Sequence, residues 1–323
     1  MQLELRHLRT LRAIADQGSV TKAAAALGVS QPALTAQLRR IERLLGGAVF
    51  TRDHRGVTAT AFGEFVLARA RAVLAGVDDL LAAGPDELAG KEIRAGSFEH
   101  PVVVPLVDRL AAALPEARIT LQTEHFVRVL VDMVANGRLD VALVADYPDH
   151  ELRPNPSFGM GVVAVEPVFV AVPASHPLAV REELELADLA HEPWVVPPSD
   201  GMGWPEHLLE ACERAGFAPR ARYQLVEAGV RRELIGSGHA VSACQAHYEP
   251  GERVAVLPLR GDPLWMRQVL IWRHSLAAHA PALLEAARAA HTSVAARGAA
   301  YAAWLGSRGR KVGEHDGLGG RPL

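Results

Sequence analysis

One stretch constrains the fold of this chain more than any other: SQPALTAQLRRIERLLGGAVFTRDHR, from Ser30 to Arg55. Ser30 is a good N-cap, because its hydroxyl can accept a hydrogen bond from a free amide of the first helical turn. Pro32 lies in that turn, where it removes no intrahelical bond. The apolar residues that follow have spacings of four, three and four and share one face: Leu34, Leu38, Ile41 and Leu45. Gly46 and Gly47 should end the helix.

The rest of this helix is polar, with amide and hydroxyl groups near its start and arginines further along. The residues concerned are Gln31, Thr35, Gln37, Arg39, Arg40 and Arg43. Amides and hydroxyls can meet base edges in the major groove of DNA, while arginines can meet phosphates or guanines. Periodicity alone leaves open an amphipathic helix with a solvated charged face.

The run also resembles the helix-turn-helix signature of LysR-type transcriptional regulators, in which Ser-Gln-Pro-Ala-Leu-Thr opens the recognition helix. Further matches at fixed spacing are Leu38, Ile41, Glu42, Leu45, Gly46, Phe50, Arg52, Arg55, Thr60 and Gly63. Two positions depart, since the family usually has Leu where Ala59 stands and Ala where Phe62 stands. The resemblance implies a winged helix-turn-helix that contacts DNA through Thr21, Ser30, Gln31, Pro32, Thr35, Gln37, Arg39, Arg52 and Arg55.

Two helices are expected before the recognition helix. Apolar residues repeat every third position in the first, which Gly18 should end, and Ser19 should cap a short Ala-rich second helix that stops at Gly28. Residues 1–60 carry nine Lys or Arg and four Asp or Glu, a balance of plus five, so the total of minus three leaves minus eight for the rest. A basic DNA-binding domain over 1–60 on an acidic body fits this asymmetry.

A long helix is predicted from Ala61 to Leu81. Its apolar stripe of Phe62, Val66, Val73, Val77 and Leu80 is narrow, which favours pairing between helices over packing on a small head. The resemblance implies a homodimer through antiparallel linker helices, and the choice between a homodimer and a homotetramer is open at this stage. Residues 82–85 break the helix, and 86–90 are expected to form a hinge, so the linker spans 61–90.

Strand and helix signals alternate after the hinge, which predicts an α/β domain with largely parallel sheets. The runs GRLDVALVA (Gly137 to Ala145) and EPVFVAVPASHPLA (Glu166 to Ala179), with Leu186 to Trp194, are close to runs common in the family's effector domain. The resemblance implies a two-lobed, periplasmic-binding-protein-like effector domain over 91–305. Lobe I would comprise 91–161 and 268–305, and lobe II 162–267. The glycine-rich tail 306–323 is expected to be disordered.

No catalytic motif is found: the sequence has no HExxH, no GxSxG and no Walker loop. His100, His125, His150 and His176 are scattered, without metal-ligand spacing. Cys212 and Cys244 are far apart and are expected to be buried free thiols rather than a disulfide or a redox pair. We therefore expect no enzyme activity, no cofactor and no metal.

Ligands of open α/β sheets collect at the carboxyl ends of strands. These ends lie at 97–100 and 124–127, and the resemblance implies that 199–204 and 225–229 face them across a cleft. The candidate effector-binding residues are Ser97, Phe98, His100, His125, Phe126, Val127, Gly201, Met202, Trp204 and Glu227. The aromatic residues and Met202 point weakly to a partly apolar or aromatic effector.

No apolar run reaches the roughly 18 to 20 residues that span a bilayer, and arginines interrupt the N-terminal region, so a cytoplasmic protein is expected. The sequence thus predicts a LysR-type regulator that binds double-stranded DNA and a small-molecule effector. The alternative is an enzyme or solute-binding protein that uses the same two-lobed body with an accessory head. Effector identity, target genes and the choice between activation and repression are open at this stage.

Overall fold

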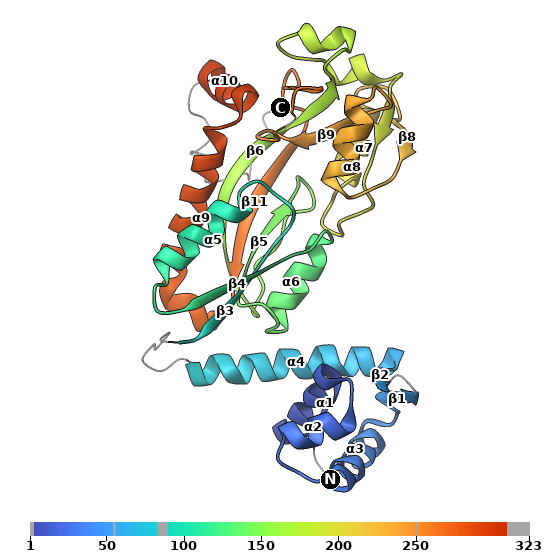
Figure 1. Ribbon diagram of the computed structural model, residues 1–323, viewed down its shortest axis with the longest axis vertical. Coiled ribbons are helices and arrows are strands. Elements are labelled where there is room, and N and C mark those ends of the chain that lie inside the picture. Colours follow the sequence, from blue (N-terminus) through green and yellow to red (C-terminus); the bar gives the residue numbers. More distant parts are fainter. Residues whose placement is uncertain (1–2, 54–55, 83–89, 250, 309–323) are drawn as a thin grey trace.

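The computed structural model describes residues 3–53, 56–82, 90–249 and 251–308. A small helical head lies at one end, a long helix crosses above it, and a larger α/β body lies beyond that helix (Figure 1). The elements of the head and the crossing helix are α1 (Leu5–Gln17), α2 (Val20–Ala26), α3 (Gln31–Leu45), β1 (Phe50–Asp53), β2 (Gly56–Ala59) and α4 (Ala61–Ala82). No helix among the described residues is long and apolar enough to cross a membrane.

The head follows its local sequence signals. Gly18 ends α1 and Gly46 ends α3, both in the left-handed conformation with φ of 56° and 79°. Ser19 and Ser30 cap α2 and α3, and the hydroxyl of Ser30 accepts a hydrogen bond from Ala33 N at 3.4 Å. The apolar faces meet in one core, which contains Leu11, Ile14, Val20, Ala23, Ala24, Leu34, Leu38, Ile41, Val49, Phe50, Val66 and Leu67.

The wing is the antiparallel hairpin β1–β2, and it is held against two helices. Val57 N donates to Gly18 O at 3.0 Å, and a Cβ at Gly56 would lie 2.6 Å from the same oxygen, so this approach requires glycine. Glu42 in α3 accepts hydrogen bonds from Val49 N at 2.9 Å and Phe50 N at 3.3 Å. The start of the wing is therefore fixed to the recognition helix.

Helix α4 packs on its own head more closely than its sequence pattern indicates. Val66 belongs to the head core, and Leu8 of α1 packs with Ala70 and Leu74. The predicted stripe is wrong at Val66, because packing on α1 takes up that side of the helix. The outward face instead carries Phe62, Phe65 and Val73, which are 39%, 60% and 49% exposed.

The body has one continuous sheet in the order β4-β3-β5-β11-β6-β9-β7-β8, with β10 pairing with β6. Two long antiparallel strands, β6 (Gly159–Pro173) and β11 (Trp265–Trp272), run through both lobes. They carry a parallel group on each side, so the sheet is mixed rather than largely parallel. The first lobe contains β3 (Glu92–Ser97), α5 (Val103–Ala113), β4 (Arg118–Thr123), α6 (Val127–Ala135) and β5 (Val141–Asp146).

The second lobe is built around the far half of β6. Its elements are η1 (Pro177–Val180), η2 (Leu186–Leu189), β7 (Pro193–Val195), α7 (Glu206–Arg214), β8 (Arg220–Tyr223), α8 (Ala228–Gly236), β9 (Val241–Gln245) and β10 (Val254–Leu257). Cys212 and Cys244 are buried free thiols, as the sequence predicts.

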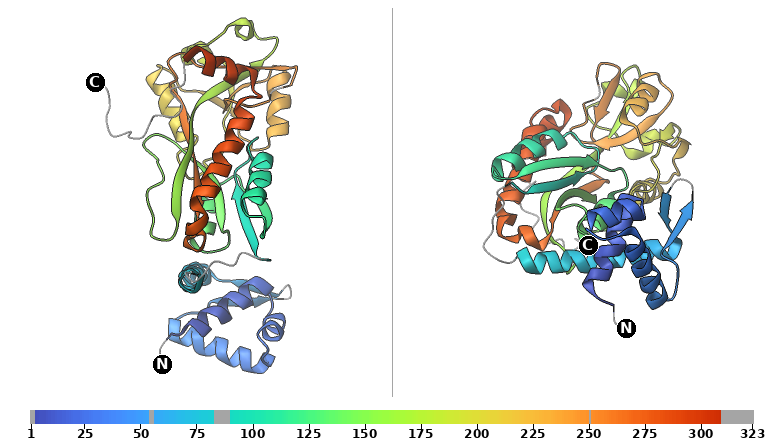
Figure 2. Two further views of the ribbon diagram at one scale, coloured as in Figure 1. Left: turned by 90° about the vertical axis from the view of Figure 1, so that its left-hand side faces the viewer. Right: turned by 60° about the horizontal axis from the view of Figure 1, so that its bottom comes forward.

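The C-terminal helices join both lobes, which corrects the assignment of 268–305 to lobe I. After η3 (His274–His279), α9 (Ala280–Ala295) runs along α5 and β6, as Figures 1 and 2 show. Helix α10 (Ala299–Arg308) packs on lobe II, because Tyr301 and Trp304 share a core with Phe169 and Ile235. Helix α10 includes 306–308, which the sequence predicts as part of the tail, and 309–323 lie outside the described residues.

The linker helix also touches the body directly. The Arg273 guanidinium donates from Nη2 to Ala75 O of α4 at 3.0 Å and lies 3.5 Å from Asp140 Oδ1. Asp140 in turn accepts from Arg94 at 2.8 and 2.9 Å. The hinge expected at 86–90 lies mostly outside the described residues, and it is not the only connection, because these contacts hold α4 beneath lobe I.

Candidate DNA-binding surface and effector cavity

The first turn of α3 is presented to solvent, as a helix that enters a groove of DNA requires. Gln31, Pro32 and Arg39 are exposed, Thr35 is half-buried, and Thr21 is exposed on the preceding helix. Gln31 Nε2 donates to Thr35 Oγ1 at 3.2 Å, so the two side chains hold one another on the outer face of α3. A hydrogen bond of this exposed kind can be exchanged for bonds to base edges.

Gln37 occupies a different position from the other candidates. Its amide donates to Thr10 Oγ1 of α1 at 3.1 Å, and Thr10 donates to Arg6 O at 2.9 Å. Gln37 therefore joins α3 to α1, which explains its partial burial and favours a positioning role over base contact. The side chains of Arg52 and Arg55 lie outside the described residues; the backbone of Arg52 pairs with Val57 in the wing.

A cavity of about 110 Å³ lies between the two lobes of the body. Its wall comes from both lobes and from the two crossing strands, β6 and β11, which run through both lobes. The residues that line it are Phe98, Glu99, His125, Val127, Tyr147, Val168, Pro197, Asp200, Trp204, Val226, Arg231, Ala243, Cys244, Gln245 and Met266. Of the ten predicted effector-binding residues, four line it: Phe98, His125, Val127 and Trp204.

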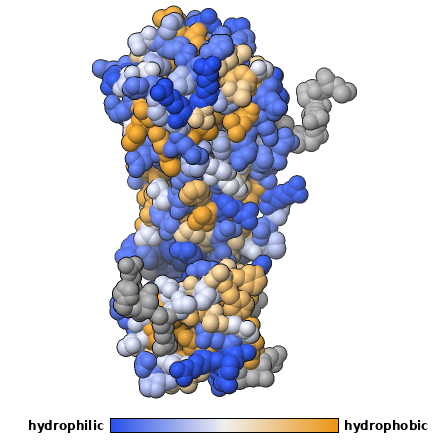
Figure 3. Space-filling model, turned by 90° about the vertical axis from the view of Figure 1, so that its right-hand side faces the viewer, coloured by the Kyte–Doolittle hydropathy of each residue, from blue (hydrophilic) through white to orange (hydrophobic). Residues whose placement is uncertain are grey.

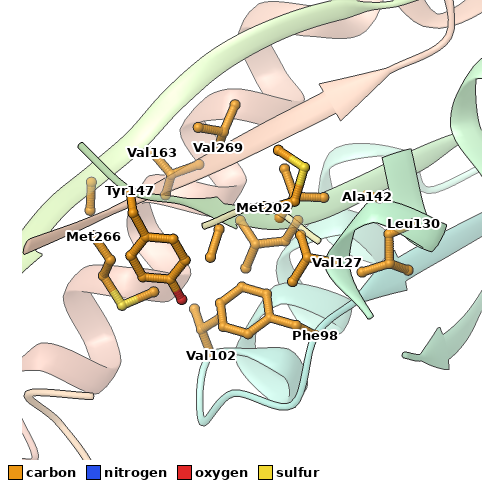
Figure 4. Packing of buried hydrophobic residues seen from close by; sticks show 14 of the residues in the cluster. Phe98, Val102, Val127, Leu130, Ala142, Tyr147, Val163, Met202, Met266 and Val269 are labelled. Atoms are coloured by element: carbon orange, nitrogen blue, oxygen red, sulfur yellow. The ribbon is translucent and has the colours of Figure 1, made fainter. Parts of the chain in front are cut away.

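The other six predicted residues do not line this cavity. Ser97 is fully buried and its hydroxyl donates to Phe98 O at 2.9 Å, and Met202 belongs to the apolar core (Figure 4). Phe126 is 45% exposed. The backbone of Gly201 packs against Arg128, and Glu227 is exposed at the N-terminus of α8. His100 lies in a buried polar cluster described below. All six lie within two residues of a lining residue in the sequence, but none of them lines the cavity.

Several lining residues were missed although the rule that ligands collect at strand ends covers them. Tyr147 directly follows β5, and Cys244 and Gln245 end β9. Asp200 lies within the segment 199–204, in which the sequence indicates Gly201, Met202 and Trp204 instead. Arg231 is on α8, and it reaches the cavity only through tertiary packing.

Burial shifts the pKa values of two groups in the cavity wall, Tyr147 and Cys244. Burial raises the pKa of Tyr147 well above its ordinary value, and the nearby Asp200, Asp146 and Glu166 raise it further. Burial also raises the pKa of the Cys244 thiol to about 12, so this thiol stays protonated at neutral pH and is a poor nucleophile.

A buried polar cluster lies beside the cavity, where both lobes meet the crossing strands. It contains His100, Glu166, His247, Gln268 and His291. Glu166 accepts from Gln268 Nε2 and from His291 Nε2, each at 2.8 Å. The Nε2 atoms of His247 and His100 are 2.8 Å apart. Of the four histidines that the sequence predicts to be scattered, only His100 lies in this cluster, and the fold brings His247 and His291 to the same carboxylate.

The electrostatics of this cluster are coupled. Burial would raise the pKa of Glu166, but the neighbouring His247, His100 and His291 outweigh the effect of burial and lower that pKa. Burial lowers the pKa of His247 to about 4 and also lowers the pKa of His100, in both cases against the attraction of Glu166. The carboxylate is thus ionised, and the His100 and His247 imidazoles are neutral at pH 7.

His100, Glu166 and His247 present ligand atoms within 4.8 Å of one another, a spacing that a metal ion could use. However, Val102 N donates to His100 Nδ1 at 3.1 Å, which places the proton of the neutral ring on Nε2, the atom that would face the metal. Metal-binding histidines normally donate from their other nitrogen instead. The donor pattern therefore fits a chain of hydrogen bonds, from His100 Nε2 to His247 Nε2, better than a metal site.

The architecture defines a class of protein: a winged helix-turn-helix joined by a long helix to a two-lobed ligand-binding body. Two family models match the chain, "Bacterial regulatory helix-turn-helix protein, lysR family" over residues 5–64 and "LysR substrate binding domain" over 93–292. The chain belongs to the LysR family and is a DNA-binding transcriptional regulator.

Similar proteins carry matching descriptions. The chain is 37% identical over 307 residues to a small neutral protease regulatory protein of Streptomyces coelicolor, covering 93% of this chain and 96% of that one. It is 31% identical over 270 residues to the HTH-type transcriptional regulator YnfL of Escherichia coli, covering 82% and 88%. Full-length OxyR from Pseudomonas aeruginosa has the same fold, with a TM-score of 0.70 at 24% identity over 89% of this chain and 95% of that one.

Proposed function

We propose that a small molecule bound in the cavity between the lobes controls how the head engages DNA. The observation that carries this proposal is that the cavity wall comes from both lobes, so that occupancy can favour one arrangement of the lobes over another. The contacts from Arg273 to α4 and to Asp140 give a path by which the body can act on the linker helix. The metabolite acts as a signal rather than as a substrate.

The assembly we propose is a homodimer through the outward face of α4, which can pair further into a tetramer. Phe62, Phe65 and Val73 are separated by three and eight residues and lie on one side of the helix. The space-filling view shows apolar side chains gathered above the hydrophilic base of the head (Figure 3). Burial of this face against a second copy would place two recognition helices on two half-sites of one operator in the cytoplasm.

Filling the cavity tests its assignment. Ala243 lies in its wall, so Ala243→Leu should occupy the space that an effector needs while leaving the head unchanged. In a thermal-shift screen with metabolites, a compound at 100 times its Kd should stabilise the wild type by about 2.7 kcal/mol. That shift should be lost in Ala243→Leu, and the compound should no longer alter the operator footprint.

Two further variants frame this experiment. Val226→Phe fills the cavity from a different segment, and Val180→Phe adds the same bulk at a site that is 89% exposed. Val180→Phe is the control, and it alone of the three variants should respond to the compound as the wild type does. If both cavity variants keep the wild-type shift and footprint, the effector binds elsewhere.

A further inference from the structure

Asp200 is a buried carboxylate in the wall of the cavity. It is 5% exposed, and Oδ1 accepts hydrogen bonds from Met202 N at 2.7 Å and Trp204 N at 3.1 Å. These two amides do not fully offset burial, which raises the pKa of this carboxyl. Among the described residues, no Lys, Arg or His forms an ion pair with it. A buried carboxylate without a cationic partner is stabilised when a cation enters the cavity beside it.

The charged groups around Asp200 do not supply that cation. His125 is near enough to favour the ionised form, but its Nε2 is buried and has no hydrogen-bond partner among the described residues. Glu206 acts in the opposite direction, since its charge raises the pKa of Asp200. The side chain of Arg128, whose backbone amide donates to Asp200 O, pairs with Asp132 at 3.3 Å.

Aromatic rings form the wall next to this carboxylate. The rings of Tyr147 and Trp204 have centroids 5.3 Å apart at an interplanar angle of 32°, and Phe98 contributes a third ring to the same cavity. Figure 4 shows the rings of Tyr147 and Phe98 among the buried residues that pack beneath strands β6 and β11. Aromatic faces attract ammonium groups, most strongly where water is excluded. Three rings and a carboxylate together suit an organic cation better than an anion.

The rest of the wall limits the size of the ligand and the chemical character of the part that lies away from Asp200. Val127, Val168, Val226 and Met266 offer an apolar surface. The volume of about 110 Å³ is smaller than the roughly 150 Å³ of a cavity known to admit benzene. A short aliphatic chain fits this space, and Arg231 with Gln245 could hold a polar group at its far end.

We propose that the cavity recognises a small organic ammonium compound, with its positive group against Asp200 and the rings of Tyr147 and Trp204 and its aliphatic part against the valines. This proposal rests on the function proposed above and specifies the chemical class of the effector. In the absence of ligand, Asp200 is retained at a cost in stability, as groups in binding sites often are.

The test uses the full-length protein and three probes of similar size: isobutylamine, which is cationic, isobutanol, which is neutral, and isovalerate, which is anionic. Isobutylamine should bind the wild type in calorimetry and raise its unfolding temperature, while isobutanol and isovalerate should bind at least tenfold more weakly. Asp200→Asn keeps the acceptor for both amides but removes the charge, so it should weaken isobutylamine binding at least tenfold. The exposed control Asp108→Asn should bind as the wild type does.

A second measurement needs no ligand. Without its buried charge, ligand-free Asp200→Asn should unfold at a higher temperature than the wild type. A lower unfolding temperature, no isobutylamine binding to the wild type, or equal binding to Asp200→Asn would each overturn the proposal. If a screened effector loses its shift in Ala243→Leu but keeps it in Asp200→Asn, the cavity is the effector site and the ammonium class is wrong. If neither variant affects it, both proposals fail.

Discussion

Replacing Glu166 with alanine is expected to lower the free energy of unfolding by about 3 kcal/mol or more, because two buried donors lose a charged acceptor and a hydrogen bond to a charged group contributes about 1.5 to 3 kcal/mol. The carboxylate is fully buried and accepts from Gln268 and His291, each at 2.8 Å, so both donors would lose their acceptor. Chemical denaturation of the full-length protein, followed by circular dichroism, measures the change.

The surface pair of Glu192 and His176, at 3.4 Å, provides the control for this prediction. Both partners keep some contact with water, so Glu192→Ala should cost about 1 kcal/mol or less. A Glu166→Ala protein as stable as the control would show that the cluster adds nothing to the connection between the lobes.

The same cluster should make the body sensitive to acid. The pKa of His247 is about 4 in the folded protein, because of burial, and about 6.5 in an unfolded chain. The unfolded state therefore binds more protons between these values, so stability falls as the pH drops from 6.5 toward 4, by roughly 3 kcal/mol for this group. The lowered pKa of Glu166 acts in the same direction below its ordinary range.

Introducing two aspartates on the outward face of α4 should separate the proposed dimer into monomers. Phe65 and Val73 are 60% and 49% exposed in one copy, so Phe65→Asp with Val73→Asp should leave the head core intact while placing charges in an apolar interface. The double variant should sediment as a monomer. Its operator affinity should fall by about 100-fold or more, since the second half-site no longer gains from effective concentration.

Val180→Asp is the control, because Val180 is an apolar side chain that is 89% exposed and lies in η1 of lobe II, away from α4. This control should stay dimeric and bind the operator as the wild type does. Intact dimers in the double variant would remove this face of α4 from the interface.

The head could be predicted closely because its signals are local. Ser30 and Pro32 mark the start of α3 and Gly46 marks its end, and the observed helix, Gln31–Leu45, begins and ends where they indicate. The error at Val66 has a different origin. Helical spacing shows which residues share a face, but it does not show whether that face meets the same chain or a second copy.

The cavity could be predicted only in part, because strand ends are local signals whereas side-chain direction is not. Phe98 and His125 follow strands and do line it, while Ser97 turns into the core and Phe126 turns to solvent. Arg231 comes from a helix that no strand-end rule singles out.

The histidine cluster lay beyond sequence reasoning altogether. His100 and His247 are 147 residues apart, and no periodicity connects them. The topology of the crossing strands brings them together around Glu166.

The claim that the exposed start of α3 reads DNA is tested most directly by the affinities of the wild type and Gln31→Ala for operator and random DNA, measured across a range of salt concentrations. We expect the preference of Gln31→Ala for the operator to fall by roughly 5- to 150-fold, which corresponds to about 1 to 3 kcal/mol, with an unchanged salt slope. Arg39→Gln should instead weaken both complexes alike and reduce the slope by about one. Unchanged discrimination in Gln31→Ala would contradict the assignment of α3 as the helix that reads the bases.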